Sequence, residues 1–368
     1  MSRMPAPVTL SARLASAFAP PAWLAHPHVQ SVLPSLRLRR PLLARRAARM
    51  LACDRVHVLD CGEGVRLIGH HASHAAAGEA PARDLVILLH GWEGSAESLY
   101  VLSLGSHLFE LGCDVFRLNF RDHGPSHHLN PEIFHSCRIA EVVGAVRCVQ
   151  SMFPKQRLTI AGFSLGGNFA LRVAVRAPAR GIRLEQAIAV CPVLSPHSTM
   201  AALENGWFVY QRYFIAKWKR SLEIKQRHFP ELYDFRPILA QHSLRAMTEM
   251  LVERYSEFPD LDAYLNGYSI VGDALAALEV PSRILFALDD PIIPARDLPA
   301  LARTPRLEVL ESARGGHCGF MDRLHGPSWA DRQVAALMGL DTRGRDADGE
   351  PDRIPSAART RDRDPGRP

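Results

Sequence analysis

The sequence has neither a pair of cysteines at the C-x-x-C spacing nor a long apolar run. Its seven cysteines form an odd number, which argues against a disulfide framework or a structural zinc site and favours reduced thiols in the cytoplasm. No run approaches the roughly 18 apolar residues of a transmembrane helix. The apolar patch LASAFA at residues 14–19 leads directly into Pro20 and Pro21, which does not fit a signal peptide.

An excess of charge of one sign is also missing. The 44 basic and 38 acidic residues are mostly mixed along the chain and leave a net charge of +6 over 368 residues, so nucleic acid is not an expected partner. Six arginines gather in residues 36–50. We interpret this segment as a solvated connector to the first strand, and attraction to a membrane surface is the less favoured alternative.

Large apolar side chains are scarce at the end of the chain. Residues 341–368 contain only Ile354 of this kind, which is too little to offset the entropy lost on ordering and predicts a disordered tail. Before the tail, short apolar segments alternate with helical patterns. Strands are predicted at residues 55–61, 65–71, 84–90, 113–120, 157–163, 187–193, 283–288 and 306–312, and helices at 96–111, 135–152, 165–177 and 327–339.

This alternation predicts an α/β fold with a mostly parallel sheet and helices on both faces. Residues 1–54 are expected to be an N-terminal extension that packs on the core or leads into it, and residues 55–195 together with 277–340 form the core. Residues 196–276 show aromatic-rich helical patterns where a short crossover would suffice. They are predicted to form an inserted helical cap.

The segment IAGFSLGGN places Ser164 in the pattern G-x-S-x-G, between a predicted strand and a predicted helix. This context is typical of a nucleophile elbow, in which Gly162 and Gly166 let the strand and the helix approach closely. The N-terminus of the helix would favour developing negative charge beside the serine. Ser164 is therefore the candidate nucleophile.

A serine hydroxyl needs a base, and the base needs an acid that orients it. Of the 17 histidines, His317 follows a predicted strand in a glycine-rich loop. The cluster HHASH at residues 70–74 puts neighbouring imidazoles on opposite faces of a strand and does not predict a metal site. The acid is expected after the preceding strand, where Asp289 and Asp290 are adjacent, and capping of the turn before Pro291 is their alternative role.

Donors for a negatively charged oxygen are expected at the segment HGWEGS, residues 90–95, directly after a buried strand. The backbone N–H groups of Trp92 and Leu165 are predicted to form an oxyanion hole. His90 precedes the turn, so we interpret it as an anchor of the loop and not as a catalytic group.

Five segments together resemble the YheT-like branch of the α/β-hydrolases, which includes bacterial esterases, yeast acyl-CoA:ethanol acyltransferases and mammalian membrane-anchored lipases. They are PAWLAHPHVQSVLP at 21–34, HGWEGS at 90–95, GFSLGGN at 162–168, ALDDP at 287–291 and GGHCGF at 315–320. The likeness covers roughly residues 20–340. It implies the α/β-hydrolase fold and a serine carboxylesterase or acyltransferase with Ser164, Asp290 and His317 as its triad. The frame small-x-x-D-x-x-V-P, which this fold often shows, selects Asp290 over Asp289.

Two segments depart from the family pattern. Ser31 stands where members commonly have a threonine, and RDHGPSHHLN at residues 121–130 replaces a loop of the RGCSG type. The loop is expected near the pocket. Its polar side chains are interpreted as hydrogen-bonded loop residues in preference to substrate contacts; they are Asp122, His123, His127 and His128.

One stretch of the cap, residues 207–222, is amphipathic. Helical spacing places on one face Trp207, Tyr210, Phe214, Trp218 and Leu222. Packing on the core is the favoured interpretation, and a lid over an acyl pocket is compatible with it. Insertion into a membrane interface is the third alternative.

The sequence therefore predicts hydrolysis of short- to medium-chain acyl esters through an acyl-enzyme on Ser164. No metal or organic cofactor is expected, and the partner is a small-molecule ester, with weak membrane-surface association through the cap or the N-terminal arginines left open. Acyl transfer to an alcohol, lipase, thioesterase and peptidase activities use the same triad. A non-catalytic binding module is the alternative from another class. Oligomeric state and natural substrate are left open.

Overall fold

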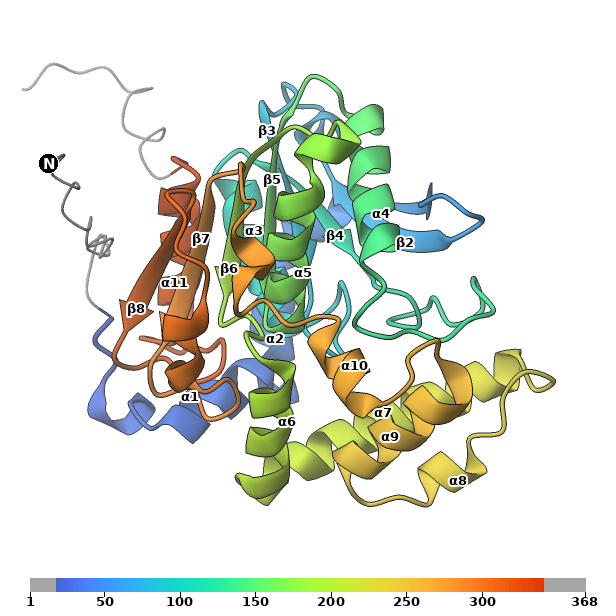
Figure 1. Cartoon of the computed structure of the whole chain (residues 1–368). Helices are drawn as coiled ribbons and strands as arrows, with labels where there is room; N and C mark the ends of the chain where they lie inside the picture. The colour runs from blue at the N-terminus through green and yellow to red at the C-terminus, as the bar shows by residue number, and fades with distance from the viewer. Residues whose placement is uncertain (1–17, 341–368) are drawn as a thin grey trace, which may run out of the picture.

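The computed structural model describes residues 18–340, and the predicted disordered tail lies outside the described residues. The described part contains one sheet of eight strands in the order β1-β2-β4-β3-β5-β6-β7-β8 (Figure 1). β2 pairs in antiparallel fashion with β1 on one side and with β4 on the other, whereas the pairs from β4 through β8 are parallel. The expectation of a mostly parallel sheet is confirmed.

Each of the eight predicted strands is present. Their bounds are β1 Asp54–Asp60, β2 Arg66–Ala72, β3 Asp84–Leu89, β4 Asp114–Leu118, β5 Arg157–Phe163, β6 Leu184–Val190, β7 Ser282–Ala287 and β8 Leu307–Ser312. The largest shift is in β6, which begins three residues before its apolar run. Its first residue, Leu184, pairs with Leu158 of β5. The register between the two strands shifts after this pair, and Thr159 pairs with Gln186.

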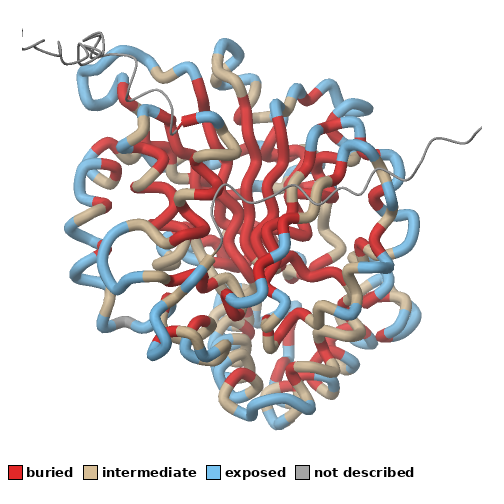
Figure 2. The backbone as a smooth tube through the Cα atoms, turned by 90° about the vertical axis from the view of Figure 1, so that its left-hand side faces the viewer, coloured by how far each residue is buried: buried red, intermediate tan, exposed pale blue. Residues whose placement is uncertain are grey.

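Helices cover both faces of the sheet, because alternate side chains of a strand point to opposite sides. Along β3, Leu85 and Ile87 join the apolar cluster formed with α4 (Ile139–Met152) and α5 (Leu165–Arg176). Val86 and Leu88 join the cluster on the other face, where the helices are α2 (Arg40–Ala52), α3 (Leu99–Glu110) and α11 (Trp329–Leu337). The central strands are accordingly buried over most of their length (Figure 2).

The segment between β6 and β7 is helical. Its α-helices are α6 (Pro196–Asn205), α7 (Phe208–His228), α8 (Arg236–Leu239), α9 (Leu244–Tyr255) and α10 (Leu261–Asn266). They gather beneath the sheet in Figure 1, on the side of its carboxyl edge. Its helices share an apolar cluster that also includes Ile133 of the loop before α4. The short 3₁₀ helices of the chain are η1 Ala22–Leu24, η2 Leu33–Ser35, η3 Arg37–Arg39, η4 His74–Ala77, η5 Pro178–Arg180, η6 Asp273–Leu275 and η7 Ala295–Ala300.

The arginine-rich segment at residues 36–50 leads into β1, as predicted, and Arg40, Arg45 and Arg49 are exposed, but the segment is a packed helix and not only a solvated connector. Most of it belongs to α2, which follows the short helix α1 (Pro27–Val32). Leu43, Ala47 and Met50 of α2 are buried on one face, since residues at this spacing share one side of a helix. Arg46 donates to the carbonyl oxygen of Ser103 at 2.7 Å. The segment is therefore packed against α3.

A buried ion pair fastens the cap to the core. Nζ of Lys225, in α7, donates to Oδ1 of Asp122 at 2.8 Å and to the carbonyl oxygens of Asn130 at 2.6 Å and Glu132 at 3.0 Å. The Lys225 and Asp122 side chains are 1% and 4% exposed. Three acceptors satisfy the three donors of the ammonium group, so removal of either partner leaves an uncompensated buried charge.

Replacement of Lys225 by methionine should lower the free energy of unfolding by about 3–5 kcal/mol, the usual cost of breaking a buried pair. Urea unfolding measures the change. Lys219→Met, on the same helix, is the matched control and should cost far less. Asp122→Asn combined with Lys225→Met should cost less than the sum of the two single changes. Equal losses in the Lys219 and Lys225 variants would contradict the assignment.

Candidate active site

Ser164 lies in a sharp turn between β5 and α5, with φ 53° and ψ −121°. A Cβ atom on Gly162 would lie 2.2 Å from the carbonyl oxygen of Gly166, and one on Gly166 would lie 2.4 Å from that of Leu89. Neither position accepts a side chain. The glycines thus permit the close approach of strand and helix, and the strained turn presents Ser164 to the pocket.

His317 is hydrogen-bonded to Asp290, the second of the two adjacent acids. The Nδ1–H group of His317 donates to Oδ2 of Asp290 over 2.8 Å. The other carboxylate oxygen accepts the backbone N–H groups of Ile292 at 2.8 Å and Ile293 at 3.0 Å. A carboxylate can only accept, so Nδ1 carries the proton and Nε2 is left as a base. His317 and Ser164 line the same pocket.

Asp289 has a different task. Its Oδ1 accepts the backbone N–H of Gly316 at 2.8 Å. The two acids therefore hold the same loop, Asp290 through the imidazole ring and Asp289 through the backbone beside it.

The predicted oxyanion donors lie on either side of the nucleophile. Leu165 is the first residue of α5, where backbone N–H groups have no acceptor within the helix. Trp92 follows Gly91, where an added Cβ atom would lie 3.3 Å from Cβ of Ser164. Both residues line the pocket. The loop after β3 therefore passes close to Ser164.

His90 anchors this loop, as its sequence position suggests. Its Nδ1–H group donates to the carbonyl oxygen of Gly91 at 2.8 Å, and Nε2 accepts the N–H of Phe120 at 3.2 Å. Burial lowers the pKa of His90 to about 4, so the ring is neutral and both nitrogens are used. Burial also raises the pKa of Glu93 to about 8, which disfavours a negative charge in the segment at residues 90–95, the oxyanion loop.

Two residues near the N-terminus hold the His317 loop, and their role was missed in the sequence. The Oγ atom of Ser31 accepts the N–H of His317 at 2.8 Å. The side chain of Gln30 bonds both the N–H and the carbonyl group of Met321, at 2.7 and 2.8 Å. The conspicuous segment at residues 21–34 was the available signal, but these contacts join positions nearly 300 residues apart.

A thiol lies beside the base. Sγ of Cys318 is 3.9 Å from Nε2 of His317. Burial would raise the pKa of this thiol, but Cys191 and His317 lower it to about 6. Burial would likewise lower the pKa of His317, but the Asp290 carboxylate and Cys318 hold that pKa well above 6.5.

The loop at residues 121–130 is mainly a docking platform for the cap. Asp122 binds Lys225 as described above, and Nε2 of His127 bonds Oγ of Ser221 at 2.9 Å. Nε2 of His123 accepts the N–H of Glu93 at 3.2 Å. Asp122, His123 and His127 also line the pocket, whereas His128 lies beside His228 with the ring centroids 5.8 Å apart.

One group in the described residues has metal-ligand spacing: Asp54, His70 and Glu97. The guanidinium group of Arg117 bonds both Asp54 and Glu97. The buried arginine thus neutralises part of the negative charge of this group, and we interpret the group as an ion-pair network.

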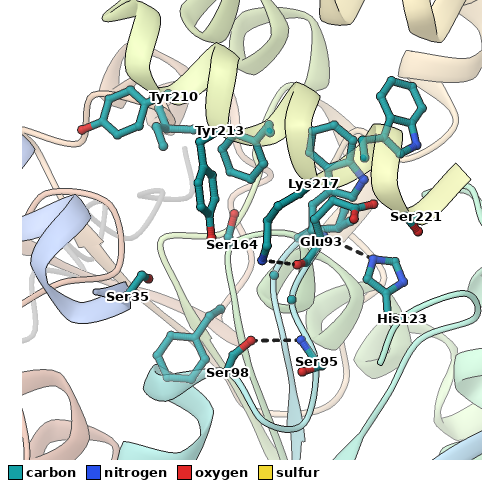
Figure 3. Close-up of a pocket in the computed structure, with 18 of the residues that line it drawn as sticks. Ser35, Glu93, Ser95, Ser98, His123, Ser164, Tyr210, Tyr213, Lys217 and Ser221 are labelled. Atoms are coloured by element: carbon teal, nitrogen blue, oxygen red, sulfur yellow. Dashed lines mark hydrogen bonds between the residues drawn. The ribbon is translucent and has the colours of Figure 1, made fainter. Parts of the chain in front are cut away.

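The three predicted lid residues take two different positions. Phe214 and Trp218 line the pocket, where both rings pack on Trp92 with centroid distances of 5.3 Å. Trp207 caps the start of α7, is 41% exposed and packs on His28. The pocket has a volume of about 960 Å³, and in Figure 3 Tyr213 of α7 points towards Ser164.

Comparison with known proteins agrees with this fold. Residues 84–215 match a family described as the alpha/beta hydrolase fold. Two solved structures are similar: a serine hydrolase from the bacterium Cycloclasticus zankles (TM-score 0.51, 18% identity, 80% of this chain and 100% of that chain) and an esterase from Pyrococcus furiosus (TM-score 0.52, 15% identity, 82% and 93%). The chain has the α/β-hydrolase fold.

Curated relatives support the predicted resemblance to the YheT-like branch. YheT of Escherichia coli, an esterase by name, is 23% identical over 262 residues, which cover 70% of this chain and 76% of that protein. The phospholipase ABHD3 of Mus musculus is 23% identical over 252 residues, which cover 66% of this chain and 60% of the mouse protein. The match therefore spans about three fifths of the mammalian relative. Within residues 18–340, no helix is both long and apolar enough to cross a membrane.

The pH dependence should report the state of His317. Only neutral imidazole accepts the serine proton, so the rate should rise with pH, and because the pKa is raised the midpoint should lie above 6.5. The measurement is kcat/KM for a neutral ester against pH, with the rate of fluorophosphonate labelling as a check that is independent of product release. A flat profile from about pH 5 to 9 would contradict a histidine base.

The two adjacent acids should differ under the same substitution. Asp290→Asn should lower kcat on the order of 10⁴-fold, since the amide favours the wrong imidazole tautomer. Asp289→Asn keeps an oxygen that can accept the Gly316 N–H and should be much milder. Steady-state kinetics of both variants decide the point, and a larger loss in the Asp289 variant would reverse the assignment.

Proposed function

We propose that this protein hydrolyses carboxylic esters through an acyl-enzyme on Ser164. The observation that carries the proposal is the His317–Asp290 hydrogen bond of 2.8 Å in the wall of the pocket that also contains Ser164. A nucleophile on a strained turn, a base whose Nδ1 is held by a carboxylate and two backbone donors are the parts that acyl transfer requires.

The groups act in the following order. Nε2 of His317 removes the proton from Ser164 while Oγ attacks the ester carbonyl carbon, and the N–H groups of Trp92 and Leu165 bind the negatively charged oxygen. His317 then returns the proton to the departing alcohol. A water molecule, deprotonated by the same imidazole, attacks the acyl-enzyme and releases the carboxylic acid. Asp290 stabilises the imidazolium form throughout.

Short- to medium-chain acyl esters are the proposed substrates. The pocket volume of about 960 Å³ lies at the upper end of the usual range for small-molecule sites. Phe214, Trp218 and Leu165 are among its apolar lining residues, and they suit an acyl chain.

Hydrolysis of a phospholipid is a second candidate. Three basic side chains line the same pocket, Arg40, Lys217 and Arg220, and they suit a phosphate group. The matched mouse relative carries the name of a phospholipase. Release of fatty acid from a short-chain phosphatidylcholine, compared with a neutral ester of the same acyl length, separates the two candidates.

Ser164→Ala should lower ester hydrolysis by several orders of magnitude and abolish covalent labelling by a fluorophosphonate, because the nucleophile is removed. Its melting temperature and far-ultraviolet dichroism should stay close to those of the wild type, since little packing is lost. Mass spectrometry of the labelled wild-type protein should place the adduct on Ser164. Labelling of Ser164→Ala at wild-type yield would exclude the proposed mechanism.

A further inference from the structure

Helix α7 contacts two loops of the core, the one after β3 and the one after β4, with a regular stripe of side chains. Phe214, Lys217, Trp218, Ser221 and Lys225 recur at the spacing of one helix face. Ser221 and Lys225 bind the loop after β4. Phe214, Lys217 and Trp218 bind the loop after β3, which carries Trp92 (Figure 3).

The backbone next to Trp92 is held from both the core and the cap. The N–H of Glu93 donates to Nε2 of His123 at 3.2 Å, and its carbonyl oxygen accepts Nζ of Lys217 at 2.6 Å. Glu93 itself has φ +55°, a conformation that most side chains disfavour. Hydrogen bonds from two other segments therefore support the uncommon backbone conformation of Glu93, which directly follows the proposed oxyanion donor.

The side chain of Trp92 is held by the cap as well. Its ring stacks on Phe214 at 5.3 Å with an interplanar angle of 16°, and Trp218 meets it edge-on at 5.3 Å and 68°. The direction of the Trp92 N–H thus depends on contacts from α7 to its ring and to the next residue's backbone.

We propose that Lys217 is a positioning residue for the oxyanion hole, and that docking of the cap and stabilisation of the oxyanion are coupled through it. The inference rests on the acyl-enzyme mechanism proposed above. Oxyanion donors must meet the developing charge within a few tenths of an ångström. A cap whose α7 is displaced leaves Ser164, His317 and Asp290 in place but moves the Trp92 donor.

The test compares four variants with the wild type on p-nitrophenyl acetate, a neutral ester too short to need the apolar face of the cap. Lys217→Met and Lys217→Ala remove the donor and should lower kcat on the order of 10- to 100-fold, below the 10²–10³-fold loss of a whole donor, with KM within about twofold. Lys217→Arg restores a cationic donor and should recover most of kcat. Lys219→Met, on the same helix and outside the pocket lining, is the matched control and should behave as the wild type.

Inhibitor binding provides a second readout, which reports the stabilisation of the oxyanion separately from turnover. A trifluoromethyl ketone that forms a tetrahedral adduct with Ser164 should bind more weakly in Lys217→Met by the same factor as the loss in kcat. The melting temperature should change little, because Lys217 is exposed.

Three results would overturn the inference. An unchanged kcat in Lys217→Met would show that the bond to Glu93 is not needed. A higher KM with kcat unchanged would make Lys217 a substrate contact. An equal loss of kcat in Lys217→Arg, accompanied by a lower melting temperature, would make the role of Lys217 structural. Failure of the wild-type protein to label at Ser164 would instead refute the proposed function itself, so the two failures are distinguishable.

Discussion

The active-site loop that carries His317 depends on being held at three points. Asp290 binds the imidazole, Asp289 binds the backbone N–H of Gly316, and Ser31 binds the N–H of His317 itself. The packing is close: a Cβ atom on Gly319 would lie 2.1 Å from the carbonyl oxygen of Gln30. Because a base must meet its nucleophile with an error well below 1 Å, the N-terminal helix α1 supports the proposed catalytic site even though it contributes no reacting group.

The sheet supplies the second constraint. Parallel strands end at one edge, so β3, β5, β7 and β8 deliver Trp92, Ser164, Asp290 and the His317 loop to the same place. Two glycines then let α5 start immediately after β5. The strain at Ser164 is tolerated because buried strands on both sides fix its backbone, whose N–H donates to the carbonyl oxygen of Val190 at 2.9 Å.

Local patterns explain what could be predicted from the sequence. Buried strands are short apolar runs, so their positions were evident, and the elbow and the two acids lie at strand ends where turn residues are conspicuous. The functions of Gln30, Ser31 and Lys217 were not evident. Each acts through a contact with a distant segment, such as the 124 residues that separate Lys217 from Glu93, and no local pattern encodes such a pairing. The arginines of α2 suggested a solvated segment, but Leu43, Ala47 and Met50 on its buried face determine where this helix packs.

The cap is held unequally along α7. Towards its C-terminal end, Lys225 forms a buried ion pair with three acceptors, and motion there would expose or orphan a charge. Towards its N-terminal end, Tyr210 bonds Nδ1 of His28 at 2.8 Å, while Phe208 is 60% exposed. A neutral hydrogen bond contributes about 1 kcal/mol, against several for a buried ion pair. The start of α7 should therefore open at lower cost than its end, and since Lys217 lies between the two, we expect such opening to reach the oxyanion loop before it disturbs the ion pair of Lys225.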